Sequence, residues 1–326
     1  MSFADSDLPL SEAEYGALRE GAGFRLLDDR ALVRVIGDDR AAFFHGICSA
    51  DVKGAKPGDI LPALLLTEHA HLIGEFFIWV DERALTLETA AAKWPSEREH
   101  LEKLLVADDV EIEDLADQGV LHIEGARAAD MLVNVEISGA HALKPCRCSK
   151  SVNAILGRMP RFGADAFAMI GDRAALADVA ERLARAGAMA VSDATLDIIR
   201  VEHGIARAGL DTTDKTIALE ARMERAISFN KGCYLGQETI ERATSRGGLK
   251  KRLFGLRFEA PITPGSALIL DGKEVGQVTS AVVSPQLGAI GLAILHHSAW
   301  TPGQRLITRD PNGDINAVVS DLPFDK

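Results

Sequence analysis

The sequence predicts an α+β protein with a ferredoxin-like split βαβ unit in its middle third and an antiparallel β-barrel at its C-terminal end. The first observation is a strand–helix–strand–strand–helix–strand order between Val120 and Val191. The second is a change, from Arg252 onward, to short strands of alternating polarity. The third is size: 326 residues, 47% of them hydrophobic, are enough for two or three domains with separate cores.

The N-terminal third is expected to contain strands and three helices, the first of them a short helix opened by a capping box at Ser11–Glu14. Apolar runs at Leu61–Leu66 and Leu72–Val80 indicate buried strands. Ser96 and Glu99 have the spacing of a capping box, which predicts that a helix begins there. The other expected elements are a strand at Leu32–Ile36, a helix after Asp38 or Asp39, and a strand at Leu85–Glu88.

In the ferredoxin-like segment we expect strands at Val120–Ile123, 153–159, 166–170 and Ala188–Val191, with helices at 126–134 and 173–186. A further helix is expected from Ser192 or Asp193 to Gly204, where glycine ends it. The barrel strands are expected at Leu253–Phe258, Ala267–Leu270, Val275–Val283, Ala289–Leu295, Leu306–Thr308 and Ile315–Ser320. Asp271-Gly272 indicates a hairpin turn between two of them.

Composition excludes several functional classes. A net charge of −12 argues against nucleic-acid binding through bulk charge. No apolar run approaches about 18 residues, so no membrane partner is expected. The N-terminus does not resemble a secretory signal and cysteines are few, which favours a reducing cytoplasm. One local basic stretch is either a solvated linker or a binding site for an anionic ligand or partner. It contains Arg242, Arg246, Lys250, Lys251 and Arg252.

Residues 231–238 read KGCYLGQE and form the first candidate site. If a helix starts near Tyr234, the Cys233 thiol lies at its N-terminus, where the helix dipole and Lys231 would both favour thiolate. The alternative is an inert cysteine beside a tight turn.

Two carboxylates are further candidates. Glu202, near Arg200 at a helix end, could accept hydrogen bonds from the N–H and amino groups of a heterocycle, or lie on an exposed helix surface. Glu75 stands in an apolar run, where burial would shift its pKa unless it faces solvent. No metal site is predicted: the spacing of Cys146 and Cys148 is too short for zinc, and the histidines lack further ligands.

KGCYLGQE followed by Arg242 resembles the signature of YgfZ-like proteins, a branch of the glycine-cleavage T-protein (GcvT) superfamily related to mitochondrial iron–sulfur assembly factors. The resemblance covers roughly residues 30–320. Its other matching segments are Phe43–Gly46 with Asp51-Val52, Leu65–Phe77, Arg200–Gly204, Gly276–Ser280 and Gly291–Ala293.

The resemblance implies a three-domain ring like that of aminomethyltransferase, with tetrahydrofolate or a one-carbon derivative in the central hole. The domains would be 1–117 (the first part of the folate-binding domain), 118–250 (the ferredoxin-like unit with both motifs) and 251–326 (the barrel). Glu202 would hold the pterin. Glu75 stands where the family has an aspartate facing the one-carbon end, and Ala70 stands where it has glycine.

The first hypothesis is a tetrahydrofolate-binding accessory protein for iron–sulfur cluster assembly or repair, which could affect iron–sulfur tRNA-modifying enzymes. Its partners would be reduced folate and iron–sulfur proteins or their assembly machinery. The alternatives are a folate-dependent aminomethyltransferase, or another one-carbon transferase, and a scaffold with a vestigial folate pocket. Whether the protein is an enzyme stays open. Cys233 with Lys231 would carry the chemistry, joined by Glu75 in a transferase; the expected folate contacts are Glu202, Glu75, Arg200, Tyr234, Gln237 and Arg242.

Overall fold

A computed structural model of the chain describes residues 12–151, 153–163, 166–245, 248–310 and 313–324. The chain folds into two compact units. The first contains the described residues up to Ala63 together with Gly74–Leu196, and the second contains Leu64–Ile73 together with the described residues from Asp197 onward. The hairpin tip at Leu64–Ile73 therefore belongs to a different unit from the strands that lead into it.

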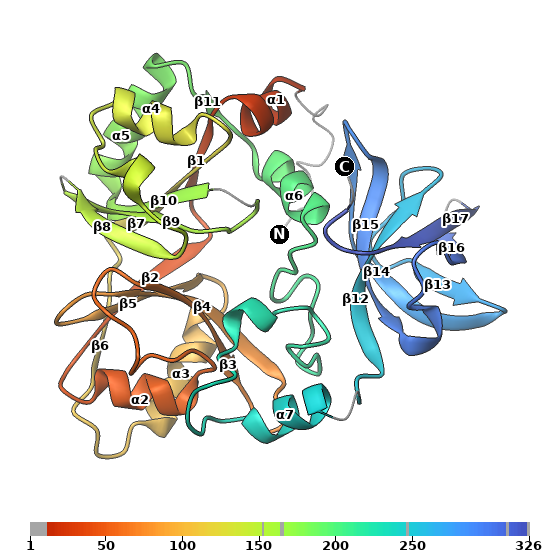
Figure 1. Cartoon of the computed structure of the whole chain (residues 1–326), viewed down its shortest axis with the longest axis horizontal. Coiled ribbons are helices and arrows are strands. Elements are labelled where there is room, and N and C mark those ends of the chain that lie inside the picture. Colours follow the sequence, from red (N-terminus) through yellow and green to blue (C-terminus); the bar gives the residue numbers. More distant parts are fainter. Residues whose placement is uncertain (1–11, 152, 164–165, 246–247, 311–312, 325–326) are drawn as a thin grey trace. The chain divides into compact units, whose positions relative to one another are not determined.

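The first unit contains a six-stranded sheet in the order β11-β1-β7-β10-β9-β8. Helices α4 (Ala128–Asn134) and α5 (Arg173–Arg185) cover one of its faces (Figure 1). Their apolar side chains form a core with those of β7 and β10. The strands are β1 (Gly23–Leu27), β7 (Gln118–Glu124), β8 (Arg147–Ser151), β9 (Ala154–Arg158), β10 (Ala166–Asp172) and β11 (Met189–Ala190).

The order of β11, β7, β10 and β9 is that of a ferredoxin-like unit, which confirms the predicted fold of this segment. Strand β1 is inserted between β11 and β7, parallel to the first and antiparallel to the second. The predicted domain boundary at residue 117 assigned residues 23–27 to the first domain, whereas β1 pairs with two strands of the ferredoxin-like unit. The sequence of residues 23–27 contains no motif that shows which of the two sheets of this unit the strand joins.

The same unit holds a second, five-stranded sheet in the order β3-β4-β5-β2-β6. Helix α3 (Trp94–Leu104) begins two residues before Ser96, with Pro95 in its first turn. The predicted capping box is therefore wrong, and the Ser96 hydroxyl donates to the Lys93 carbonyl instead. The remaining elements are β2 (Arg30–Ile36), β3 (Ile60–Leu66), β4 (Leu72–Val80), β5 (Leu85–Ala90), β6 (Glu111–Asp114), α1 (Glu12–Glu20) and α2 (Arg40–Ile47).

The second unit contains helices α6 (Asp193–Glu202), whose last six residues lie in it, and α7 (Gln237–Ser245), followed by a closed six-stranded antiparallel barrel. Strand β12 pairs with both β15 and β17, and this double pairing closes the barrel. The predicted barrel is confirmed. Its strands are β12 (Lys251–Phe258), β13 (Ala267–Leu270), β14 (Lys273–Ser284), β15 (Gly288–His296), β16 (Arg305–Asp310) and β17 (Gly313–Ser320).

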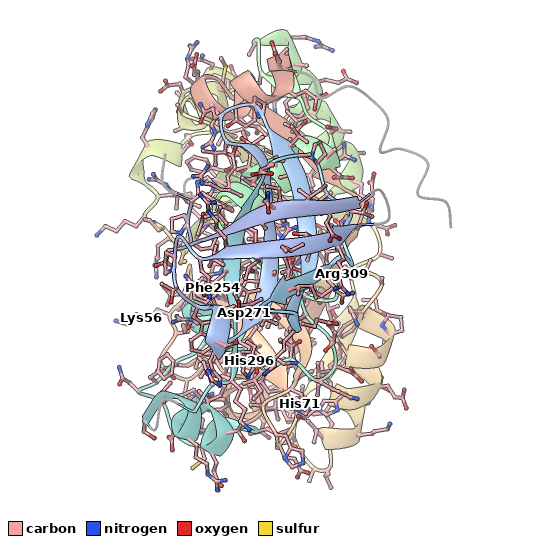
Figure 2. All side chains as sticks on the ribbon, turned by 90° about the vertical axis from the view of Figure 1, so that its right-hand side faces the viewer. Lys56, His71, Phe254, Asp271, His296 and Arg309 are labelled. Atoms are coloured by element: carbon pink, nitrogen blue, oxygen red, sulfur yellow. The ribbon has the colours of Figure 1, made fainter. Side chains whose placement is uncertain are left out.

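The hairpin between β13 and β14 turns at Asp271-Gly272, as predicted. Both residues have positive φ, 50° and 77°, which matches the right-handed twist of the flanking strands. Figure 2 labels Asp271 in this turn and His296 at the end of β15, both on the barrel.

Candidate functional site

Cys233 is exposed and lies in a loop, four residues before α7 begins at Gln237. The helix considered near Tyr234 begins three residues later, at Gln237, so Cys233 does not lie at its N-terminus. The reason is local: Leu235 and Gly236 form a turn, and Gly236 has a φ of +87°. The thiol is nevertheless accessible: Gly232 and Cys233 are exposed, whereas Tyr234 and Gly236 of the same motif are buried.

The rest of the motif is held by its own side chains. The Lys231 ammonium lies over the ring of Tyr234, 4.8 Å from its centroid, and the ring is buried. The Gln237 amide accepts the Tyr234 N–H (3.2 Å) and donates to Glu241 (2.6 Å). The structure therefore brings Lys231, Tyr234 and Gln237 together around the turn before α7. Their predicted folate or catalytic roles stay predictions.

The motif packs on the turn between β3 and β4 within the second unit. A Cβ at Gly236 would lie 2.7 Å from the Thr67 carbonyl oxygen and 3.1 Å from Cα of Ala70. Ala70 is fully buried and has a φ of +59°, a conformation that disfavours every residue with a Cβ. The positive φ at position 70 explains why the family pattern has glycine there. In this chain Ala70 adopts the same backbone conformation with some strain.

Arg200 lies at the centre of a buried ion network in the second unit. Its guanidinium is 2% exposed and donates to Asp211 (2.6 Å), Asp197 (2.7 Å) and the Ser280 hydroxyl (2.8 Å). Asp211 also accepts from the hydroxyls of Thr279 and Ser280, each at 2.6 Å. Burial lowers the pKa of Arg200, but the carboxylates of Asp211 and Asp197 outweigh it, so the pKa lies above its ordinary value.

This network ties α6 to the loop after it and to β14 of the barrel. Arg200 therefore fixes the end of α6 against the following loop and β14. Its direct contact with folate stays a prediction. Sequence reasoning missed Asp211, which lies in a polar segment without periodicity. The matching Gly276–Ser280 segment contained the available signal, because Thr279 and Ser280 are two of its members.

Glu202 is also buried, two residues further along the same helix. It is 4% exposed, and the Ser284 hydroxyl donates to Oε1 at 2.5 Å. Ser284 is itself fixed by the N–H groups of Gln286 and Leu287 (3.1 and 3.0 Å). The alternative of an exposed helix surface is therefore wrong for both Arg200 and Glu202. A carboxylate anchored in this way is a rigid hydrogen-bond acceptor.

Glu75 lies on β4 in the first unit and is half-buried. Its neighbour Gly74 is buried and packs directly against the carboxyl group of Glu97 on α3. Sequence reasoning did not identify Glu97 as a candidate site residue. Its burial could not be predicted from the sequence, since residues 94–104 show the polar pattern of a surface helix.

The basic stretch is less positive than its sequence suggests. Arg242 pairs with Glu238 (3.3 Å) and Arg252 with Glu224 (3.5 Å), whereas Arg246 lies outside the described residues. Lys251 lines an open cleft of about 800 Å³ in the second unit. Acidic and basic side chains both line it: Asp211, Lys215, Glu220, Lys251, Glu274 and His296.

Within the part of the chain that the structure describes, no group of three or more His, Cys, Asp or Glu side chains could hold a metal ion. The described helices include none that is long and apolar enough to cross a membrane. Cys146 and Cys148 are free thiols and half-buried. Burial raises the pKa of Cys148 to about 11.

Comparison with known proteins places this architecture in a family. The sequence model of the GCVT N-terminal domain matches residues 3–231, and that of the glycine cleavage T-protein C-terminal barrel domain matches residues 251–326. The chain belongs to the glycine cleavage T-protein family. The aminomethyltransferase T structure of the Bartonella henselae glycine cleavage system has the same fold, with a TM-score of 0.88 and 22% identity over 96% of this chain and 89% of that one.

Curated members of the T-protein family are similar along most of the chain. A chloroplastic protein of Arabidopsis thaliana named as a transferase is 28% identical over 90% of this chain and 68% of its own length. Aminomethyltransferases of Thermosipho melanesiensis and Rubrobacter xylanophilus are 24% and 26% identical, each over 99% of this chain and at least 90% of their own length. The comparisons support the T-protein superfamily, while the finer YgfZ-like placement rests on the KGCYLGQE motif.

Proposed function

We propose that this T-protein family member binds a reduced folate and uses it in the transfer of a one-carbon group. The family match over both domain models and the aminomethyltransferases among the relatives support this alternative better than the accessory role that the motif first suggested. The structural observation that carries the proposal is Glu202, a buried carboxylate held in one orientation by Ser284.

The chemistry of Glu202 fits the pterin edge of a reduced folate. That edge presents an amino group and a ring N–H side by side, and a fixed carboxylate can accept from both. Arg200 and its carboxylate partners hold the last turns of α6, so the acceptor does not have to be ordered when the ligand binds.

Glu75 is the second carboxylate of the proposal. A bound tetrahydrofolate would supply the nitrogen atoms that carry the one-carbon unit. Glu75 would orient that end by accepting a hydrogen bond, as its position in the family pattern implies. It is one methylene longer than the aspartate of the family, so its carboxylate reaches further from the strand.

Calorimetry with tetrahydrofolate under anaerobic conditions tests the proposal. Loss of a charge-assisted hydrogen bond costs about 1.5–3 kcal/mol, so Glu202→Gln should weaken binding by about 10- to 150-fold. Asp193→Asn, an exposed carboxylate at the other end of α6, is the matched control and should bind like the wild type. Equal affinity of Glu202→Gln and wild type would remove Glu202 from the site.

A second candidate function is the accessory role in iron–sulfur cluster assembly or repair, within the cytoplasm. The exposure of the Cys233 thiol favours it, because an accessible thiol can react with a partner whereas a buried one cannot. A vestigial pocket on a scaffold is the third possibility, and absence of any folate binding would support it.

A further inference from the structure

Glu97 is a buried carboxyl group that neither motif explains. It is 1% exposed, at the interface between α3 and the five-stranded sheet. The Thr89 hydroxyl on β5 donates to Oε2 at 2.8 Å. Oε1 is also buried and has no hydrogen-bond partner among the described residues. A buried carboxylate with one neutral donor is poorly compensated, which favours the protonated acid.

The unpartnered side of this carboxyl group lies against the backbone of β4. A Cβ at Gly74 would lie 2.3 Å from Oε1 and 3.1 Å from Cγ of Glu97. Only glycine leaves room for the carboxyl group at this point. The next residue along the strand is Glu75, so Glu97 packs on the backbone that positions the carboxylate assigned to the one-carbon end of folate.

Charged groups face Glu97 from several elements. Burial raises its pKa most strongly; Thr89, Arg30 and Lys93 act in the opposite direction, and the carboxylate of Glu75 raises it further. The net result is a pKa of about 7. Arg30 compensates only in part, because its guanidinium also binds Glu88 at 3.0 Å.

We propose that Glu97 is a positioning residue for Glu75: its neutral carboxyl group supports the strand at Gly74, and its ionisation displaces that backbone and repels Glu75. The proposal rests on the proposed folate-binding function, in which Glu75 contacts the ligand. Reduced folate then binds best to the protein with Glu97 protonated, and its affinity falls as the pH rises through the neutral range.

Carboxyl-carbon NMR titration of the unliganded protein tests the coupling without any ligand. Glu75→Gln should lower the pKa of Glu97, because it removes a like charge. Thr89→Val should raise it, because it removes the hydrogen bond that the Thr89 hydroxyl donates to the carboxyl group. Glu99→Gln, an exposed carboxylate on the same helix paired with Lys103, is the matched control and should leave it unchanged. A Glu97 resonance that titrates identically in wild type and Glu75→Gln overturns the coupling.

Tetrahydrofolate calorimetry between pH 6 and pH 8 tests the effect on binding. The wild type and Glu99→Gln should lose affinity by up to about tenfold per pH unit above the pKa of Glu97. Glu97→Gln should bind like the wild type at pH 6 and show no such loss. A pH-dependent loss that persists in Glu97→Gln overturns the inference. A wild type that binds no tetrahydrofolate at any pH overturns the proposed function and with it the positioning role, while the NMR titration still decides the coupling.

Discussion

Cys233 differs from the other three cysteines in exposure. Cys48 is 1% exposed, Cys146 and Cys148 are half-buried, and Cys233 is exposed in its loop. Thiol chemistry requires both a thiolate and access to it, and burial removes both at once by raising the pKa and by steric exclusion. The distinction comes from the three-dimensional packing of each segment rather than from the charges that flank each cysteine in the sequence.

We therefore expect iodoacetamide to modify Cys233 first at pH 7.5 in the native protein. The Cys148 thiol, with its pKa raised to about 11, should react more than tenfold more slowly. Peptide mass mapping over a time course measures each site, and the same reaction in denaturant should bring the four rates together. Modification of Cys146 or Cys148 before Cys233 would contradict this ordering.

Glu97 makes a separate prediction about folding stability. Its pKa rises from 4.5 to about 7 on folding, so the native state binds the proton more tightly than the unfolded chain. Stability is therefore lost as the pH rises from about 4.5 to 7, by about 3 kcal/mol in full. Urea unfolding at pH 5 and pH 8 should show this decline in the wild type and a smaller one in Glu97→Gln. Parallel pH profiles for the two proteins would show that Glu97 does not titrate in this range.

At the scale of elements, the sequence predicted those strands and turns whose formation depends on neighbouring residues. The alternating runs from residue 253 gave the barrel strands, and Asp271-Gly272 gave a hairpin, because both depend on neighbouring residues. Long-range pairing was not available from the sequence. The insertion of β1 beside β11 and the packing of Gly74 on Glu97 depend on residues far apart in the chain.

The candidate site divides in the same way. The sequence motifs identified Glu202 and Cys233 as candidates. They did not show that Glu202 is buried or that α7 begins four residues after Cys233. Asp211 has no signal of its own in the sequence, since its role depends on contacts with Thr279 and Ser280 of β14. Local chemistry therefore names candidates, and tertiary contacts decide which of them are anchored.

Gly236 tests how the motif is held. Gly236→Ala would place a Cβ 2.7 Å from a backbone carbonyl and force a positive φ on alanine. We expect a loss of about 2–4 kcal/mol in the free energy of unfolding. The matched control is Gly187→Ala, which has a similar φ of +96° but nothing within 4 Å of the new Cβ, and should lose about 1 kcal/mol. Equal losses in the two variants would show that the motif does not pack tightly on the β3–β4 turn.

The buried pair of Arg200 and Asp211 should matter far more than a surface pair. Asp211→Asn leaves the guanidinium without its most buried counter-charge and should cost about 3–5 kcal/mol in unfolding free energy. Glu181→Gln breaks the exposed pair with Arg185 and should cost less than about 0.5 kcal/mol. Urea titration of both variants compares them directly. A small effect of Asp211→Asn would mean that the network does not fix the end of α6.

At the scale of the whole molecule, the acidic charge, the family and the exposed thiol bear on function together. A net charge of −12 disfavours nucleic acid as a direct substrate, so any effect on tRNA modification would pass through another enzyme. The match to both T-protein domain models supports the proposed folate binding. Within the described residues, Glu202 is a buried carboxylate held by Ser284, which suits ligand binding, whereas Cys233 has an exposed thiol, which suits a reaction with a partner.

Cys233→Ser separates the two candidate functions. The thiol is exposed and serine is nearly isosteric, so unfolding free energy should change by less than about 1 kcal/mol. If one-carbon transfer is the function, the variant should keep its turnover when it replaces the T-protein of a reconstituted glycine cleavage system, whereas Glu202→Gln should lose it. Cells that lack the native protein should then recover equally with wild type and Cys233→Ser. No turnover by the wild type, together with failure of Cys233→Ser to restore iron–sulfur enzyme activity at normal protein abundance, would instead establish the accessory role and make the thiol its centre.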